Sequence, residues 1–380
     1  MAAGGAAGRA GGISRPPVVA ALATAVLLMA TAATPAHGFI SGETWQAVRR
    51  ANRDAGPFVG LVVPNAYEMD PVLQSPSFNK PSNGVPAVLD VQGRRFRFGT
   101  IGGQSVVMVM TGLSMLNAGL TTQLLLSLFN VKGIVHWGIA GNANEDLQIG
   151  DVTIPEYWAH LSLWNWQRDG DGPDNELPLE AAGDYTREYG FLNFSDYTVA
   201  VGQGQLVGNT LNSIWYQPEE IFPASGTPEQ RQHAFWVPVS ERYYALAAQL
   251  ESLELPACVN ATATTPTPTC LPRAPRVTRV PRGCSANIYT DNASYRQFIR
   301  AHFGCTPVEM ESAAVALVAH QLGVPFLTIR SLSDLAGGGS ALSNEAATFL
   351  TIAAQNAVDV MLKFVPLLGG EDAGGIAQDM

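Results

Sequence analysis

The feature that most constrains the fold is an apolar strand, helix and strand in direct succession. Gln104–Met110 is a short, apolar and β-branched run, which is typical of a buried strand. Thr111–Ser114 then turns into Met115–Phe129, which has helical length and composition, and Gly133–Trp137 is the next apolar run. This order favours parallel strands joined by a right-handed crossover. The sequence therefore predicts an α/β protein with a mixed, largely parallel central sheet flanked by helices.

Further elements are expected on both sides of this unit. An apolar strand at Phe58–Pro64 precedes it, and a further buried strand is expected at Pro325–Ile329. The other predicted elements are a resumption of the core at Asn287–Tyr289, a helix at Ala293–Phe303, a helix that includes Glu309 and Glu311 in its first turn, and a terminal helix over about 343–362. The stretch Gly138–Asn142 is expected to be a glycine-punctuated turn whose backbone can approach a ligand.

Four parts of the chain are predicted. Residues 1–38 form a signal peptide, 39–57 a polar leader, 58–363 a single domain, and 364–380 a flexible, Gly-rich tail. Within the domain, residues from about 160 to 283 lose the strand and helix pattern, and 256–282 are rich in Pro and Thr. We interpret that stretch as an insertion made of loops.

The N-terminal segment has the order of a secretory signal. Arg9 and Arg15 precede the apolar run Val18–Ala33, and small residues follow at Ala36 and Gly38. This predicts the secretory pathway, with an extracellular or vacuolar destination and no membrane association after cleavage, although a signal anchor remains an alternative. No later stretch reaches 18 uninterrupted apolar residues, the length typical of a span.

Charge and composition restrict the partners. The formal net charge is −10 and the N-terminal segment contains no acid, so the mature chain is more acidic still. Nucleic acid is therefore excluded as an expected partner. Charged residues make up only 14% of the chain, which indicates that part of the surface lies in an interface between identical subunits. A homo-oligomer is expected.

All four cysteines fall in one late stretch. In a secreted chain they suggest two disulfides among three possible pairings, and we favour Cys258 with Cys270 and Cys284 with Cys305. No paired C-x-x-C motif or His cluster accompanies them, so no metal site is expected. Glycosylation sequons at Asn193, Asn260 and Asn292 agree with a secretory route.

Three carboxylates stand in otherwise apolar or strand-terminal sequence. Glu311 lies in the motif VEMES, Asp334 closes the motif TIRSLSD, and Glu68 follows the strand Phe58–Pro64. In α/β sheets, ligands bind at the carboxyl ends of parallel strands. Taken singly, each acid has a structural explanation as a helix cap, a first-turn acid or a solvated loop residue. Their common surroundings instead predict one polar site.

Several motifs in sequence order resemble the nucleoside phosphorylase/nucleosidase superfamily, and within it plant bark storage proteins. They are VGLVVPNAYEMDP from Val59, TGLSMLNAG from Thr111, GIVHWGIAGN from Gly133, QIGDVTIPE from Gln148, VEMESAAVA from Val308 and RSLSDLAGGGS from Arg330. The resemblance implies the nucleoside phosphorylase-like fold and a purine nucleoside as the small-molecule partner. It implies no cofactor.

The resemblance also implies roles for individual residues. Glu68 matches the acid that activates water, Glu311 the acid that holds the ribose hydroxyls, and Asp334 the acid that protonates the purine at N7. Met310 and Ser333 match positions that line the ribose and support the Asp. The remaining expected substrate contacts are Ile139, Ala140, Gly141, Ile288 and Tyr289.

Two alternatives to a nucleosidase remain open. Phosphate-dependent phosphorolysis needs an anion site, yet no Arg lies between Gly60 and Pro71, and Arg94, Arg95 and Arg97 also suit a solvated strand face. Hydrolysis is therefore ranked above it. A bark storage protein needs no catalysis. However, a buried charge without a function lowers the stability of the fold by roughly several kcal/mol, so the presence of the three acids favours at least nucleoside binding.

Overall fold

The computed structural model describes residues 40–81, 84–166, 191–192, 199–201, 205–207, 214–259, 269–339 and 345–369. The predicted signal peptide and the sequons at Asn193 and Asn260 lie outside these ranges. The chain separates into two units, residues 1–41 and 42–380. All elements below belong to the second unit.

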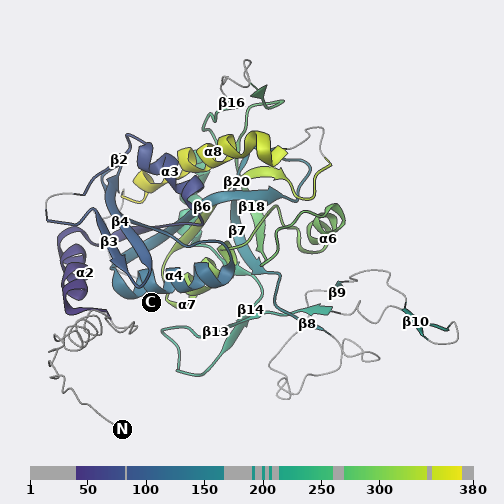
Figure 1. The fold of residues 1–380 in the computed structure, drawn as a ribbon, viewed down its shortest axis with the longest axis horizontal. Coiled ribbons are helices and arrows are strands. Elements are labelled where there is room, and N and C mark those ends of the chain that lie inside the picture. Colours follow the sequence, from purple (N-terminus) through teal and green to yellow (C-terminus); the bar gives the residue numbers. More distant parts are fainter. Residues whose placement is uncertain are drawn as a thin grey trace, which may run out of the picture. The chain divides into compact units, whose positions relative to one another are not determined.

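An 11-stranded mixed sheet forms the centre of this unit (Figure 1). Strand β1 (Phe58–Val63) lies between β5 (Gln104–Met110) and β6 (Val131–Asn142) and is parallel to both. Strand β20 (Phe326–Leu335) is parallel to β6. Every residue of β1 is buried, which explains its uninterrupted apolar sequence. The predicted parallel unit and the α/β class are thus confirmed.

Antiparallel pairings complete the sheet. At one side β4 (Arg94–Ile101) pairs with β5, and β3 (Val88–Val91) and β2 (Phe78–Asn79) pair with β4. On the other side β19 (Pro307–Glu309) is antiparallel to β6, and β20 also pairs antiparallel with β7 (Val152–His160). The sheet is therefore parallel in the middle and mixed towards its edges.

The late part of the expected insertion belongs to the core sheet, which corrects the interpretation of residues 160–283 as loops. Strand β18 (Val277–Ser285) is parallel to β7 and β19, and β15 (Val237–Pro238) pairs with β7. The sequence VTRVPRGCS hides this strand, because its Thr, Arg and Pro residues occupy the less buried positions between buried ones. The expected core segment Asn287–Tyr289 lies in the loop that follows.

Helices cover both faces of the sheet. On one face α8 (Glu345–Leu367) packs on β20 and β6 beside α3 (Ala66–Gln74), and on the other α4 (Met115–Leu128) packs against α7 (Ser312–Gln321) (Figure 1). The remaining described elements are α2 (Gly42–Ala55), α5 (Glu241–Ala247), η2 (Ala248–Leu250), α6 (Ala293–Phe303), β8 (Trp164–Trp166), β9 (Phe191–Leu192), β10 (Val199–Val201), β11 (Gln205–Val207), β12 (Ile214–Tyr216), β13 (Glu219–Ile221), β14 (Gln232–Ala234), β16 (Cys258–Val259) and β17 (Thr269–Cys270).

Several boundaries differ from those predicted. The leader contains α2, which is polar except for a stripe that buries Val48 and Ala51. Helix α8 continues to Leu367, so the expected tail from residue 364 begins inside it. Strand β6 runs through Gly138–Asn142, where a turn was expected. It continues because β20 pairs with it along this stretch.

Helix α8 is the one helix in the described part of the chain that is long and apolar enough to cross a membrane. Its segment Phe349–Leu367 has a mean hydropathy of 1.2, but 61% of that window is buried inside the protein. The burial follows from its packing on β20 and β6. Its apolar composition is therefore explained by its position in the core.

Both favoured disulfides are present. Cys258–Cys270 joins β16 to β17, and Cys284–Cys305 joins β18 to the residue after the cap of α6. The second pair is buried in an apolar cluster with Phe303 and Tyr216. Among the sequons, Asn292 is described: it is exposed, and its side-chain oxygen accepts a hydrogen bond from the Tyr295 N–H at the start of α6.

Candidate active site

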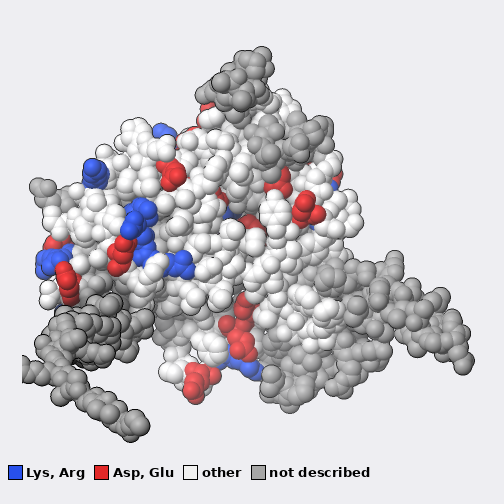
Figure 2. Space-filling model, in the orientation of Figure 1, with Lys and Arg blue, Asp and Glu red and all other residues white. Residues whose placement is uncertain are grey.

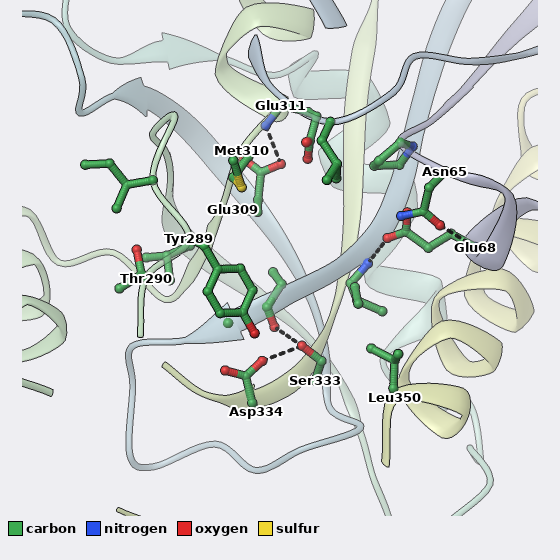
Figure 3. Close-up of a pocket in the computed structure, with 17 residues that line it drawn as sticks. Asn65, Glu68, Tyr289, Thr290, Glu309, Met310, Glu311, Ser333, Asp334 and Leu350 are labelled. Atoms are coloured by element: carbon green, nitrogen blue, oxygen red, sulfur yellow. Dashed lines mark hydrogen bonds between the residues drawn. The ribbon is translucent and has the colours of Figure 1, made fainter. Parts of the chain in front are cut away.

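A cavity of about 410 Å³ lies at the edge of the sheet where the parallel strands β1, β6 and β20 end (Figure 3). It is lined by every catalytic and substrate-binding residue that the sequence predicted: Glu68, Ile139, Ala140, Gly141, Ile288, Tyr289, Met310, Glu311, Ser333 and Asp334. Its other lining residues are Pro64, Asn65, Leu113, Thr290, Val308, Glu309 and Leu350. The residues expected to form a single polar site therefore lie around one cavity.

Glu68 enters the cavity from the first turn of α3 rather than from a loop. Asn65 caps this helix, and its side-chain oxygen accepts a hydrogen bond from the Glu68 N–H at 3.1 Å. Glu68 is 2% exposed, and its Oε1 accepts a hydrogen bond from the Ile139 N–H at 2.7 Å. The other oxygen, Oε2, is buried without a partner among the described residues. It therefore has hydrogen-bonding capacity left for a bound molecule.

Burial determines the protonation behaviour of Glu68. It raises the pKa of the carboxyl from 4.5 to about 7, against the opposing attraction of the Arg330 guanidinium and the Ile139 N–H. Gly138 makes this arrangement sterically feasible. A Cβ at that position would lie 2.5 Å from Glu68 Oε1 and closer still to Arg330, so only glycine fits between the two charged groups.

Arg330 is fully buried and connects the carboxylates of the site. Its Nη2 donates to Glu309 Oε2 and to the Ser312 hydroxyl, and lies 3.6 Å from Glu311 Oε2. Its Nη1 donates to the Ile139 carbonyl at 3.2 Å. Arg330 belongs to β20 itself rather than to the segment after it, which corrects the predicted strand end at Ile329. The same correction applies to Ser333 and Asp334.

His136 positions Arg330 from the neighbouring strand. Its Nδ1 lies 2.9 Å from the Val62 carbonyl, and its Nε2 contacts Arg330 Nη2. Burial and the adjacent guanidinium hold the pKa of His136 well below its usual range, so the imidazole is neutral. A carbonyl only accepts, so Nδ1 carries the proton and Nε2 accepts from Arg330. This residue was not predicted from the sequence, although a lone His in the apolar run of β6 was a signal for it.

The two acids of the VEMES motif have different surroundings. Glu309 ends β19 and accepts hydrogen bonds from the N–H groups of Glu311 and Ser312, both at 3.0 Å, so it caps α7. It also accepts from the Ser285 hydroxyl and from Arg330. The prediction that both acids lie in the first turn of the helix is wrong, because α7 begins at Ser312, after both of them. Glu309 is occupied by these internal contacts.

Glu311 instead faces the cavity. Its Oε1 accepts a hydrogen bond from the Ser114 N–H at 3.0 Å, at the start of α4. Burial first, and then the nearby Glu309 carboxylate, raise the pKa of Glu311 above its usual range. The side chain is only 3% exposed, and it lines the cavity with its second oxygen 3.6 Å from Arg330 Nη2.

Asp334 lies across the cavity with Ser333 and Tyr289. The Ser333 hydroxyl donates to Asp334 Oδ1 at 2.6 Å and is 3.2 Å from the Ala140 carbonyl, which fixes the orientation of the carboxyl. Figure 3 shows the Tyr289 hydroxyl directed towards this pair. The negative charge of Asp334 raises the pKa of Tyr289, in agreement with that proximity. The hydrogen bonds of Arg330 go to other groups, so its guanidinium does not bind Asp334.

Cations are scarce around the cavity. Among the described residues that line it, none is Lys or Arg. Arg94 donates to the Thr111 carbonyl at 2.6 Å and to Asn117 at 3.1 Å, and Arg95 is paired with Asp90 on the surface. The residues that the structure describes also contain no group of three or more His, Cys, Asp and Glu side chains suited to a metal ion.

Comparisons with known proteins agree with this architecture. Residues 58–366 match the family described as the phosphorylase superfamily. Bark storage protein A of Populus deltoides is 28% identical over 295 residues, covering 77% of this chain and 83% of that protein. The 5′-methylthioadenosine/S-adenosylhomocysteine nucleosidase of Lysinibacillus sphaericus is 24% identical over 279 residues, covering 73% and 88%.

A solved structure shows the same fold. The 5′-methylthioadenosine/S-adenosylhomocysteine nucleosidase of Helicobacter pylori superposes with a TM-score of 0.52 at 18% identity, covering 82% of this chain and 98% of that one. With the family match over most of its length, the chain belongs to the phosphorylase superfamily.

Proposed function

We propose that this protein hydrolyses the N-glycosidic bond of a purine nucleoside. The observation that carries the proposal is the convergence of Glu68 in α3, Glu311 at the start of α7 and Asp334 in β20 on one cavity of about 410 Å³. The similarity to nucleosidases supports the reaction class. Breaking this bond creates positive charge on the sugar and negative charge on the departing base, so it needs an acid and a base.

The three carboxyls suit three separate tasks. Glu68 takes a proton from water as the water attacks C1′, since its pKa of about 7 suits a general base near neutral pH. Asp334, held by Ser333, gives a proton to N7 of the purine as the bond to C1′ breaks. Glu311 bonds the ribose hydroxyls from the opposite wall, with Met310 beside it. Solvent returns the proton from Glu68 to Asp334 after the products leave.

Hydrolysis is favoured over phosphorolysis by the charges around the cavity. Charge-assisted bonds from Lys or Arg hold a phosphate dianion most strongly, and the described lining residues include neither. The Arg330 guanidinium is fully buried and bonded to Glu309, Ser312 and His136. Glu68 would also repel an incoming anion whenever it is ionised.

A direct assay tests the proposal. The protein is incubated with adenosine, inosine and methylthioadenosine, with and without phosphate, and the free base is measured by chromatography. Release of base together with the free sugar, which is ribose from adenosine or inosine and methylthioribose from methylthioadenosine, is the expected result, at a rate independent of phosphate. Formation of ribose 1-phosphate would establish phosphorolysis instead. Absence of both release and calorimetric binding would refute the proposal.

The pH dependence of kcat/KM provides a second prediction. Glu68 acts only when ionised, so kcat/KM is expected to increase with pH through about 7, the pKa to which burial raises this group, and to fall where Asp334 loses the proton that it gives to N7. An unperturbed Glu would place this increase near pH 4.5 instead. Steady-state rates from pH 5 to 9 locate the pH at which kcat/KM increases, which is called the rising limb below. The Glu311→Gln variant, which keeps Glu68, is expected to bind more weakly but to retain the limb; a limb near 4.5 in the wild type would contradict the role of Glu68.

A second candidate function is protein storage. It is supported by the 28% identity to bark storage protein A, which exceeds the 24% identity to the Lysinibacillus nucleosidase. A storage protein would need neither base release nor nucleoside binding. The direct assay therefore separates the two functions.

We also propose that the protein forms a homo-oligomer whose subunits associate through α4. Leu116 and Leu120 on this helix are 71% and 61% exposed, and the helix has no polar stripe, which is typical of a helix covered on all sides. Figure 2 shows that most described residues on the face in view are uncharged. In sedimentation experiments, Leu116→Asp is expected to lower the mass to that of a monomer. Gln297→Asp, at an exposed polar position of α6, should not; equal masses for the wild type and Leu116→Asp would contradict this interface.

We also propose that the chain passes through the secretory pathway to an extracellular or vacuolar destination. The two disulfides support this route, since structural disulfides form in oxidising compartments. The exposed position of Asn292 is compatible with a glycan there.

A further inference from the structure

A second cavity of about 420 Å³ lies beside the first and has no part in the proposed reaction. Aromatic side chains from β8, β12, α6 and the loop before α6 dominate its lining: Trp164, Tyr216, Tyr289, Tyr295 and Phe298. Its polar lining residues, among them Asp291 and Ser294, belong to the start of α6 and the loop before it. An aromatic cavity of this size suits a planar apolar group.

The rings of this cavity are arranged to present faces rather than polar ends. Phe298 is stacked with Tyr216 at an interplanar angle of 24° and with Tyr295 at 12°, both at 6.4 Å between centroids. The hydroxyls of Tyr216 and Tyr295 bond to each other. Because the two polar ends are satisfied internally, an occupant meets mainly apolar ring surface.

A single loop segment, Ile288–Thr290, separates the two cavities and lines both. The loop is fixed on one side by Asn287, whose N–H donates to the Ser162 hydroxyl at 2.8 Å and whose Oδ1 accepts from the Met115 N–H at 3.0 Å. On the other side Asn292 caps α6. Between these anchors Ile288 and Tyr289 are 42% and 71% exposed. A molecule that occupies both cavities would cover them.

The chemistry of Asp334 gives the direction in which a substrate would extend. The 6-amino group and N7 lie on the same edge of a purine. A base that receives its proton from Asp334 at N7 therefore turns its 6-amino group towards the side chains next to Asp334. Tyr289 is such a neighbour, since its hydroxyl faces the Ser333 and Asp334 pair (Figure 3). A substituent on the 6-amino group then reaches the segment that divides the cavities.

We propose that the second cavity binds a planar apolar substituent carried on the 6-amino group of a purine nucleoside, and so selects substrates bearing one. The inference rests on the proposed function of the first cavity and extends it to a substrate class. Placing an aryl group among Trp164, Tyr295 and Phe298 removes its surface from water. Burial of one such ring corresponds to an increase in affinity of about tenfold or more.

The test compares calorimetric binding of adenosine and N6-benzyladenosine to the whole protein. The wild type is expected to bind N6-benzyladenosine about tenfold more tightly. Ser294→Trp places an indole at the rim of the second cavity and is expected to abolish this preference without changing adenosine binding. Ser294→Ala removes the same hydroxyl and the same sequon without filling space. Gln297→Trp places an indole at an exposed position of α6 that lines neither cavity. Both controls should keep the preference.

The outcomes separate this inference from the proposed function. If adenosine binds but N6-benzyladenosine binds equally or more weakly, the second cavity is not a substituent site, and the nucleosidase proposal stands. The same conclusion follows if Ser294→Trp leaves the preference intact. If neither nucleoside binds, both proposals fail.

Discussion

Glu68→Gln is expected to reduce base release by about 10²–10⁴-fold while leaving the protein folded. The amide keeps the size of the side chain, and its oxygen can still accept the hydrogen bond from the Ile139 N–H. It cannot take a proton from water. Steady-state assays at pH 8, where Glu68 is ionised in the wild type, measure the loss.

The same substitution should affect stability in the opposite direction. Burial raises the pKa of Glu68 from 4.5 to about 7, so its stabilising contribution is complete below pH 4.5 and is lost as pH rises to about 7. A neutral amide does not titrate. Urea unfolding should therefore show Glu68→Gln to be at least as stable as the wild type at pH 8. Loss of activity with unchanged or increased stability is the pattern of a residue retained for function.

A matched acid on the same helix provides the control. Asp70 lies in α3, is exposed, and does not line the first cavity. Asp70→Asn should change neither base release nor stability. If Glu68→Gln releases base at the wild-type rate, Glu68 is not the general base, and water must be activated by another group.

The fold was predictable where the apolar pattern is continuous. Strand β5 has the predicted bounds, and α4 differs by one terminal residue, because apolar residues predominate in both segments and neither contains a proline or a charged residue. Strand β18 was missed because its partly buried Arg and Thr residues and its exposed Pro interrupt the pattern. Helix α2 was missed because its polar composition conceals a narrow apolar stripe.

The site was predictable at the level of which residues meet, but not of what each one contacts. Glu68, Glu311 and Asp334 line one cavity, as the motifs implied. The difference between Glu309 and Glu311 was not readable, because it depends on Ser285, Ser114 and Arg330, which are distant in sequence. The second cavity was equally hidden, since its walls come from β8, β12 and α6.

Arg330→Met is expected to destabilise the protein by about 3–5 kcal/mol, the largest stability effect predicted here. Arg330 is fully buried, bonded to Glu309, and 3.6 Å from Glu311. Methionine fills similar space but leaves these carboxyls buried without their cation. Urea unfolding monitored by circular dichroism measures the loss. Arg95→Met, which breaks a surface pair with Asp90, should change stability by less than about 1 kcal/mol.

The pH dependence of this loss distinguishes charge from packing. Arg330 lowers the pKa of both Glu68 and Glu311, against the raising effect of burial. Without it both folded-state pKa values rise further, so the variant loses more stability than the wild type as pH increases from 5 to 8. The destabilisation is therefore expected to be larger at pH 8 than at pH 5. An equal loss at both pH values would show that Arg330 acts through packing alone. The free energy of unfolding of Arg330→Lys should lie between those of the wild type and Arg330→Met. An ammonium keeps the charge but cannot bond His136, Ser312 and Glu309 with the same geometry.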